Sequence, residues 1–274
     1  MSDRSSHNKR IAKNTLFLYL RMGLVLVVSL FSTRVVLQAL DIEDYGINNV
    51  VSGFVTMFAF LNTSMSNGVQ RFYNFSLGRK NGYSIKDVYN TALQIQAILA
   101  VTLLVPLETF GMWYIHTQMV IPIDRFAAAQ WVFQFSVLSL VLLVLQIPYS
   151  AAIMAYEKMD YYAYLSIFDV LAKLGIAYII KYTTFDKLIL YGALNMLVSL
   201  ICFFLYYGYA KFHFQDLKSD FIIRKQLFKP MLYFSGWNGF GSFAYMIKSQ
   251  GLNMLLNVFF GPVVNAARGV SNMA

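Results

Sequence analysis

The feature that most constrains this chain is a series of long apolar segments separated by short polar connections. A segment of about 20 mainly apolar residues is long enough to cross the hydrocarbon part of a bilayer as a helix. Of the 274 residues, 58% are hydrophobic and 13% are charged, whereas soluble domains have about 25% charged residues. A water-soluble fold of this length has no way to bury so much apolar surface. The sequence therefore predicts an all-α, polytopic integral membrane protein.

Six predicted spanning helices form one transmembrane lobe over residues 15–210, after a cytoplasmic N-terminal segment over residues 1–14. The predicted helices cover residues 15–37, 46–69, 88–114, 126–147, 162–180 and 187–210. A basic cytoplasmic connector, residues 211–229, leads to a seventh helix over residues 230–247 and an eighth that begins near Leu252. We therefore expect a six-helix lobe followed by an incomplete second lobe, residues 230–274, because the chain ends at Ala274 inside the eighth helix.

The distribution of lysine and arginine predicts which side of the membrane each connection faces. The N-terminus and the second, fourth and sixth connections together hold 14 of these residues, and the alternate connections hold four. Short cytoplasmic connections are enriched in Lys and Arg. The N-terminus is therefore predicted to be cytoplasmic.

Several classes of protein are disfavoured by the residues that the chain lacks. Cys202 is the single cysteine, so the chain has no intrachain disulfide and no cysteine-based metal site. The three histidines are far apart in sequence, and neither a phosphate-binding loop nor a hydrolase or metalloprotease motif is present. The net charge of +9 is scattered between apolar segments, without a nucleic-acid-binding motif. We expect no metal, no cofactor, no nucleic-acid partner and no enzyme activity.

Charged residues inside the apolar segments are the first candidates for a functional site. A central Arg, Lys or Asp costs about 2.5–3.5 kcal/mol on insertion scales, so each needs a reason to be there. Asp169 and Lys173 are four residues apart on the fifth predicted helix, where they share a face and form either a structural ion pair or a site for substrate or ion coupling. Arg21 and Arg34 lie toward opposite ends of the first helix, where each reaches either the headgroups or a cavity.

Polar residues on the second predicted helix form a stripe about 60° wide at 100° per residue. The stripe consists of Asn49, Ser52, Thr56, Thr63 and Asn67, and it runs the length of the span. Hydrogen bonding between helices would explain such a stripe, but its length favours the wall of a water-filled cavity.

The seventh predicted helix repeats this polar pattern. Asn238 and Ser242 are four apart on one side and are predicted to line the same cavity. Gly236, Gly239 and Gly241 lie among them and permit close packing or bending of this helix.

Four stretches of the sequence carry a resemblance to a known family. They are RVVLQALDIEDYGINNVVSGFVTMFAFLN from Arg34, NGVQRFYNFSLG from Asn67, IPYSAAIMAYEKMDYYAY from Ile147 and GLNMLLNVFFGPVVNAARGV from Gly251. The chain resembles the Wzx-type polysaccharide flippases of the multidrug/oligosaccharidyl-lipid/polysaccharide (MOP) exporter superfamily. The resemblance implies a MATE/MOP-like fold, with two six-helix lobes facing each other in a V. Members of this family continue for several more helices, so we expect this chain to be a fragment or a C-terminally truncated product.

The resemblance also implies a function. Members of the family transfer undecaprenyl-pyrophosphate-linked oligosaccharide across the bacterial inner membrane by alternating access, in lipopolysaccharide, O-antigen or capsular polysaccharide biosynthesis. The implied partners are this lipid-linked oligosaccharide, membrane lipids and other polysaccharide assembly proteins. Pyrophosphate requires cations, and arginine offers a planar fork for phosphate oxygens. Arg34 is the first candidate for this role, followed by Arg21, Lys173 and Arg268.

Two alternatives stay open at this point. A proton- or sodium-coupled drug or metabolite exporter of the same superfamily would require buried acidic residues, and Asp169 is the one such residue in the predicted first lobe. A membrane-embedded polysaccharide polymerase or ligase would require a large periplasmic connection with Arg and His, whereas the predicted outer connections are short.

Overall fold

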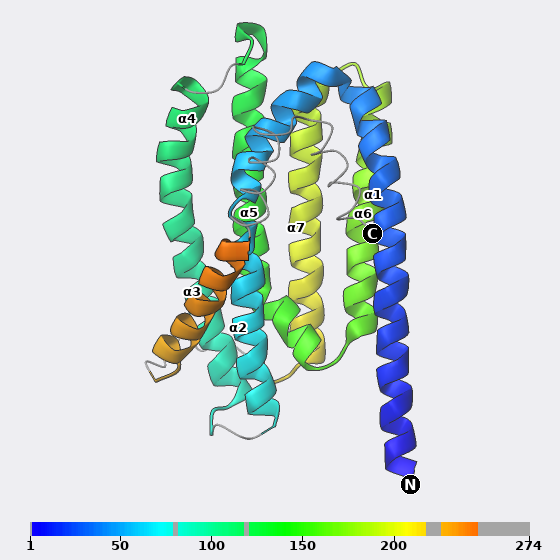
Figure 1. Cartoon of the computed structure of the whole chain (residues 1–274), viewed down its shortest axis with the longest axis vertical. Helices are drawn as coiled ribbons and strands as arrows, with labels where there is room; N and C mark the ends of the chain where they lie inside the picture. The colour runs from blue at the N-terminus through cyan, green and yellow to red at the C-terminus, as the bar shows by residue number, and fades with distance from the viewer. Residues whose placement is uncertain (1, 79–81, 118–120, 218–225, 246–274) are drawn as a thin grey trace, which may run out of the picture.

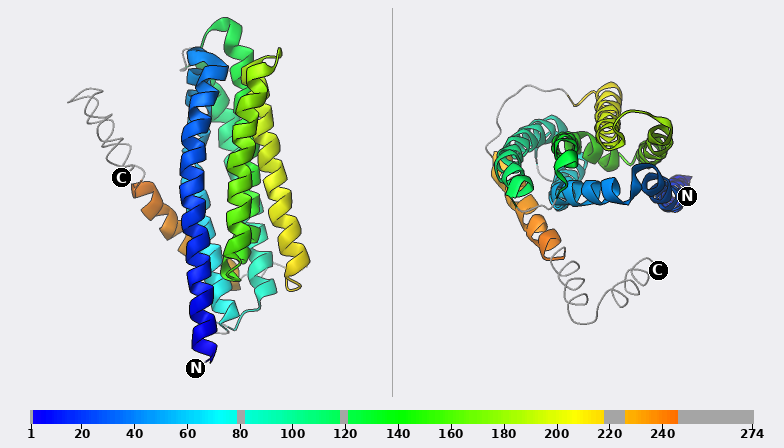
Figure 2. Two further views of the ribbon diagram at one scale, coloured as in Figure 1. Left: turned by 90° about the vertical axis from the view of Figure 1, so that its right-hand side faces the viewer. Right: turned by 90° about the horizontal axis from the view of Figure 1, so that it is seen from above.

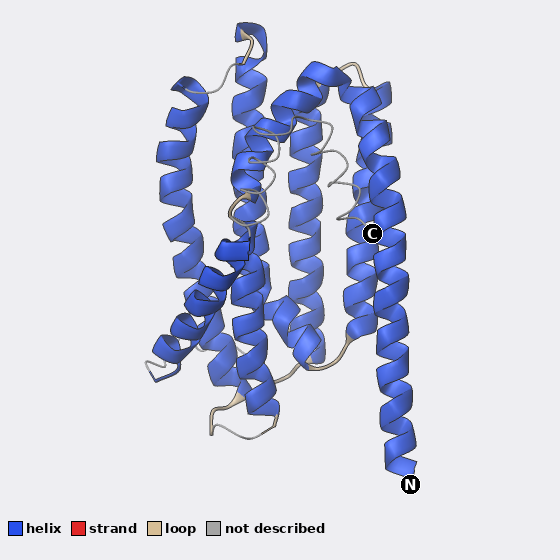
Figure 3. Ribbon diagram, viewed as in Figure 1, coloured by secondary structure: helices blue, strands red, loops and turns tan. Residues whose placement is uncertain are grey.

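The computed structural model describes residues 2–78, 82–117, 121–217 and 226–245. In these ranges the chain consists of helices joined by short turns, without a strand (Figure 3). The helices stand side by side as a bundle, with the N-terminus at its lower end (Figure 1). The structure therefore confirms the predicted all-α, polytopic architecture.

The helices run alternately up and down the bundle. They are α1 (Ser2–Thr56), α2 (Ala59–Leu77), α3 (Ile85–Pro106), the π-helix η1 (Leu107–Gly111), α4 (Met112–Thr117), the 3-10 helix η2 (Ile123–Arg125), α5 (Phe126–Ala155), α6 (Met159–Tyr182) and α7 (Lys187–His213), followed by a helix over residues 226–245. Among the described residues, five stretches are long and apolar enough to cross a membrane, namely Asn14–Asp41, Ile85–Thr117, Ile123–Ala155, Met159–Tyr182 and Lys187–His213.

The predicted second helix, residues 46–69, is interrupted in the structure. α1 turns over the upper end of the bundle at Asp41, where φ is 64° and ψ is 169°, and then descends to Thr56 (Figure 1). The amide of Phe58 donates to the carbonyl of Val55 at 3.1 Å, a tightened turn that ends this limb before α2 begins. The sequence did not reveal the interruption, because Met57 and Phe58 are as apolar as their neighbours.

The remaining predicted helices correspond to observed ones with shifted ends. Residues 2–14, predicted as a polar N-terminal segment, belong to α1. α3 begins at a capping box, in which the amide of Asp87 donates to the Ser84 hydroxyl at 3.1 Å and the Ser84 amide donates to the Asp87 carboxylate at 3.3 Å. The seventh helix was predicted over residues 230–247, and the structure describes a helix over residues 226–245. The eighth predicted helix lies outside the described residues.

An ion cluster joins three connections at the upper end of the bundle. Arg125 donates from Nε to Asp44 at 2.7 Å and from Nη1 to Asp186 at 2.7 Å. Asp186 also caps α7 by accepting the amide of Leu188 at 3.1 Å. The chain after the α1 bend, the start of α5 and the α6–α7 turn are therefore held together.

The helix ends that border the most basic connections lie at the opposite, lower end. They are the start of α1, the end of α2, the start of α3, the α5–α6 turn and the end of α7 (Figure 1). The helix ends thus alternate between the two ends of the bundle, as the count of Lys and Arg in alternate connections assumes. That the lower end is cytoplasmic stays a prediction.

The 226–245 helix crosses α2 at an angle to the bundle (Figure 2). Ser64 and Gly68 of α2 meet Ser235 and Gly239, and we call these four residues the serine–glycine crossing. The Ser64 hydroxyl donates to the carbonyl of Ser235 at 2.5 Å. A side chain added at Gly68 would collide with the Ser235 hydroxyl, and one added at Gly239 would meet the Ser64 hydroxyl at 3.2 Å. Small residues four apart on both helices thus bring the two backbones together.

Larger side chains flank the crossing on both sides. The guanidinium of Arg71 lies 4.1 Å from the ring centroid of Phe234, and the rings of Phe60 and Phe243 are 5.4 Å apart. Leu227 and Met231 are completely buried in the same apolar cluster as Tyr73. The start of the predicted second lobe is therefore packed against the first lobe by α2.

Candidate functional site

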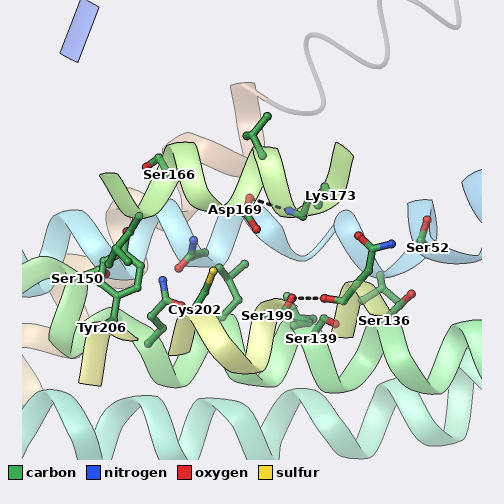
Figure 4. Close-up of a pocket in the computed structure, with 18 of the residues that line it drawn as sticks. Ser52, Ser136, Ser139, Ser150, Ser166, Asp169, Lys173, Ser199, Cys202 and Tyr206 are labelled. Atoms are coloured by element: carbon green, nitrogen blue, oxygen red, sulfur yellow. Dashed lines mark hydrogen bonds and ion pairs between the residues drawn. The ribbon is translucent and has the colours of Figure 1, made fainter. Parts of the chain in front are cut away.

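A cavity of about 610 Å³ lies inside the lobe, among α1, α2, α5, α6 and α7 (Figure 4). Its lining residues on α5 run from Phe135 to Met154, about 28 Å along a helix that rises 1.5 Å per residue. The hydrocarbon part of a bilayer is about 30 Å thick. The cavity therefore follows the lobe over most of a membrane span.

Serine hydroxyls from four helices form much of the cavity wall, and each donates to a carbonyl of its own helix. Ser136 and Ser139 of α5 donate to the carbonyls one turn earlier at 2.8 Å, and Ser199 of α7 does so at 3.0 Å. Ser166 of α6 and Ser52 of the descending limb of α1 repeat the arrangement at 2.9 and 2.5 Å. Because each hydroxyl hydrogen is used within its helix, the oxygen lone pairs remain as acceptors toward the cavity.

Asp169 and Lys173 form an ion pair in the cavity wall. The Lys173 ammonium lies 2.8 Å from a carboxylate oxygen of Asp169, one turn away on α6, as Figure 4 shows. The side chains are 32% and 44% exposed, respectively, so neither is buried in the packing. In the structure, the two residues thus share a face of α6 and pair with one another, and a role in binding or coupling stays a prediction.

Arg21 supplies a second cation from α1. Its guanidinium carbon lies 4.8 Å from the ring centroid of Tyr162, a distance at which a cation is attracted to an aromatic face. Its Nε is buried and makes no hydrogen bond with any described residue. With two cations and one carboxylate among its described lining residues, the cavity has a net positive charge.

A second cavity of about 280 Å³ adjoins the first. Asp169, Lys173, Tyr191 and Asn48 line both cavities, so the ion pair stands in the wall between them. Ser32 of α1 lines the smaller cavity, and its hydroxyl oxygen is buried without a hydrogen bond to any described residue. Among the described residues, no three His, Cys, Asp or Glu side chains come together as a metal site.

The predicted cationic residues are only partly brought together. Arg21 and Lys173 both line the larger cavity. Arg34, the first candidate, is exposed on the upper half of α1 and lines neither cavity. Arg268 lies outside the described residues. The binding of substrate by any of these four residues stays a prediction.

The residues of the polar stripe on the second predicted helix face several different surfaces in the structure. Ser52 lines the larger cavity and Asn49 the smaller one, whereas Thr63 and Asn67 are exposed and line neither. The side chain of Thr56 is among those not described. At 100° per residue, Thr63 and Asn67 lie between the cavity edge of α2 and the serine–glycine crossing.

The residues of α2 that do line the cavity are Asn62 and Ser66, one position earlier. The polar face of α2 is broad, and sequence alone does not tell which edge of it a neighbouring helix covers. On the seventh helix, Asn238 and Ser242 are half-buried on the side that carries Ser235, and a role in lining a cavity stays a prediction for them.

The α5 wall contains functional candidates that sequence reasoning missed. Ser136, Ser139, Gln146 and Ser150 recur at helical spacing on one face of an otherwise apolar helix, and all four line the cavity. That spacing was a usable signal. Gln130 and Gln134 of the same helix face elsewhere. The side-chain amide of Gln134, for example, donates to Glu108 of η1 at 2.9 Å.

Comparison with known proteins adds information about the fold. The sequence matches no family model and no curated protein. A solved structure of a MOP superfamily transporter from Pyrococcus furiosus Vc1 (DSM3638) is similar over 94% of this chain, with a TM-score of 0.67 and 12% identity. That transporter is described as having a binding pocket of reversed polarity that suggests a different function. The match spans 60% of the length of that transporter. This similarity shows that the chain shares the fold of that transporter over the matched residues.

Proposed function

We propose that this chain forms part of a flippase for undecaprenyl-pyrophosphate-linked oligosaccharide in the bacterial inner membrane. The flippase would move this lipid from the cytoplasmic to the periplasmic leaflet during lipopolysaccharide, O-antigen or capsular polysaccharide biosynthesis. The observation that carries the proposal is the chemistry of the 610 Å³ cavity, which combines cations with a wall of hydroxyl acceptors.

Two parts of the proposed substrate have complementary groups in this lobe. Arg21 and Lys173 both line the cavity, and the Nε of Arg21 has no hydrogen-bond partner among the described residues, so both cations can bind phosphate oxygens. Sugar hydroxyls are donors, and the serine oxygens face the cavity as acceptors. The polyprenyl tail would remain in the bilayer beside the lobe.

Transport by alternating access requires a second lobe, because the substrate site in such folds lies between two repeats. In this proposal the 226–245 helix begins that lobe, and its contact with α2 at the serine–glycine crossing supports the assignment. The exposed residues Thr63 and Asn67 belong in this proposal to the surface that the second lobe faces.

A cation-coupled exporter of drugs or metabolites is the competing function. Its substrate or coupling ion would need an unpaired carboxylate, whereas the described cavity walls contain one carboxylate, Asp169, which is paired with Lys173. The net positive charge of the cavity favours an anionic substrate.

Binding of undecaprenyl pyrophosphate to the chain in nanodiscs tests the proposal. Loss of one charge-assisted hydrogen bond is worth about 1.5–3 kcal/mol, so Arg21→Gln and Lys173→Met should each weaken binding by about 10- to 100-fold. Arg34→Gln is a matched control on the same helix, outside both cavities, and should change binding less. Equal binding by all variants would contradict the proposed site. A larger loss in Arg34→Gln than in Arg21→Gln would move the anion site to the exposed surface of α1.

A further inference from the structure

We infer that the lower end of α7 binds the headgroup of an anionic phospholipid on the outer surface of the lobe. The site consists of Lys211 and Tyr207 of α7, with Tyr149 of α5 packed behind them. None of these three residues lines either cavity. The lipid site is therefore separate from the proposed substrate site and does not depend on the proposed function.

The ammonium group of Lys211 is exposed and already held in place. It donates to the hydroxyl of Tyr207, one turn earlier on α7, at 2.8 Å. Lys211 forms no ion pair with any described residue. An ammonium has three donors, so two remain for an anion, and the Tyr207 hydroxyl can donate its own hydrogen to the same anion. Because Lys211 is held before a ligand arrives, less side-chain entropy is lost on binding.

A cluster of aromatic rings fixes the position of Tyr207. The ring of Tyr149 meets the ring of Tyr207 edge-on, with 5.4 Å between the centroids and 85° between the planes. Tyr149 in turn packs against Phe203 of α7 and Tyr89 of α3, each at 6.0 Å. Tyr89 and Tyr149 are both buried. Because the buried rings cannot move aside, the Tyr207 hydroxyl and the Lys211 ammonium bonded to it have a defined place.

The cluster lies where the lobe meets one surface of the bilayer. Tyr207 is six residues before His213, the end of α7, and Tyr149 is six residues before Ala155, the end of α5. Both helices end at the lower end of the bundle (Figure 1), so the two tyrosines are about 9 Å above these ends. Tyrosine is enriched at membrane–water interfaces, where its hydroxyl reaches the headgroups. The Lys211 ammonium is therefore expected at headgroup level.

An exposed apolar stripe on α7 leads to this cation. Leu197, Ile201 and Phe204 are 45%, 38% and 57% exposed, and at 100° per residue they lie within about 80° of one another and of Lys211. From Leu197 to Lys211 the stripe extends about 21 Å along the helix, more than half the thickness of the hydrocarbon region. An apolar stripe that ends in a cation matches a phospholipid, with acyl chains along the stripe and the phosphate at Lys211.

The charge of the site favours an anionic headgroup. Lys211 brings one positive charge, and the Tyr207 hydroxyl that shares its hydrogen bond is neutral. The phosphodiester of phosphatidylglycerol has one negative charge and no cation of its own. Phosphatidylcholine has the same phosphodiester together with a quaternary ammonium, which Lys211 repels.

Native mass spectrometry of the chain in detergent, with added phosphatidylglycerol, tests the site. Lys211→Gln should weaken binding of the first lipid by about tenfold or more, because a charge-assisted hydrogen bond is lost. Lys158→Gln is the matched control, since Lys158 is another exposed lysine, in the α5–α6 turn at the same end of the bundle. Loss of the general attraction between one lysine and anionic lipid should weaken binding by about fivefold at most.

Two further measurements separate a built site from a charged surface. Tyr207→Phe keeps the ring and removes the hydroxyl, and it should weaken binding of phosphatidylglycerol by about fivefold. The wild type should bind phosphatidylcholine, and glycerol phosphate without acyl chains, about tenfold or more weakly than phosphatidylglycerol. This second comparison needs no variant to fold.

Three outcomes would overturn the lipid site. They are equal losses in Lys211→Gln and Lys158→Gln, unchanged binding in Tyr207→Phe, and equal binding of phosphatidylglycerol and phosphatidylcholine by the wild type. Glycerol phosphate that binds as tightly as phosphatidylglycerol would reveal a site for free phosphate and overturn the assignment to a lipid. Because Lys211 and Tyr207 lie outside both cavities, each of these outcomes leaves the proposed function as it stands.

Discussion

The serine–glycine crossing and the cavity wall are built from similar residues and do opposite things. At the crossing, the hydroxyl of Ser64 bonds to a carbonyl of another helix, and Gly68 leaves no space for water. In the cavity, the hydroxyl of Ser139 bonds to its own helix, and its oxygen faces an open volume. A serine that joins two helices donates its hydroxyl to a carbonyl of the other helix, whereas a serine that lines the cavity donates to a carbonyl of its own helix.

This difference has a physical origin in what stands opposite each serine. A glycine on the partner helix lets two backbones approach, so a short side chain can span the gap. In the cavity, the serine side chains face an open volume instead. Ser136, Ser139 and Ser199 there bond one turn back along their own helices.

The largest expected contrast is in access to water. Ser139 lines the cavity and is half-buried, so Ser139→Cys in a Cys202→Ser background should be modified by a small water-soluble thiol reagent. Ser64→Cys in the same background places the thiol at the closed crossing. If local opening there costs about 3 kcal/mol, modification should be about 100-fold slower. Rates measured by mass spectrometry check this, and equal rates would remove the distinction between the two surfaces.

A large side chain at the crossing should separate the helices. Gly68→Leu would collide with Ser235, and overpacking of this kind costs about 1–3 kcal/mol. Gly23→Leu is the matched control, because a side chain on Gly23 meets nothing within 4 Å. Unfolding in a denaturing detergent measures both. A Gly68→Leu variant as stable as Gly23→Leu would show that the crossing is not closely packed in the membrane.

The smallest expected effect distinguishes the two kinds of serine directly. Ser64→Ala removes a hydrogen bond between helices and should cost about 1 kcal/mol of unfolding free energy. Ser139→Ala removes a bond within one helix and should change stability by less than about 0.5 kcal/mol, while weakening undecaprenyl pyrophosphate-linked sugar binding. The two variants carry the same substitution, so helix propensity cancels. A reversed order of stability would contradict the comparison.

Sequence patterns predicted those features of the site that depend on spacing along one helix. Asp169 and Lys173 pair because four residues make one turn. The apolar length of α6 and α7 was sufficient to place those helices within three residues of their observed ends, whereas α5 continues to Ala155, eight residues beyond its predicted end. Arg34 shows the limit of this reasoning, since a charge on an apolar helix does not reveal which neighbour it faces.

What the sequence by itself determined is that several helices are long and apolar enough to cross a membrane, because the length and hydropathy of a helix are properties of a continuous segment. The side of the membrane on which the basic connections lie stays a prediction. Only the tertiary structure decided which edge of α2 lines the cavity and which edge carries Ser64 and Gly68 to the 226–245 helix. The physical reason is that a polar helix face is defined locally, whereas its contact with water, lipid or another helix depends on residues far away in the chain.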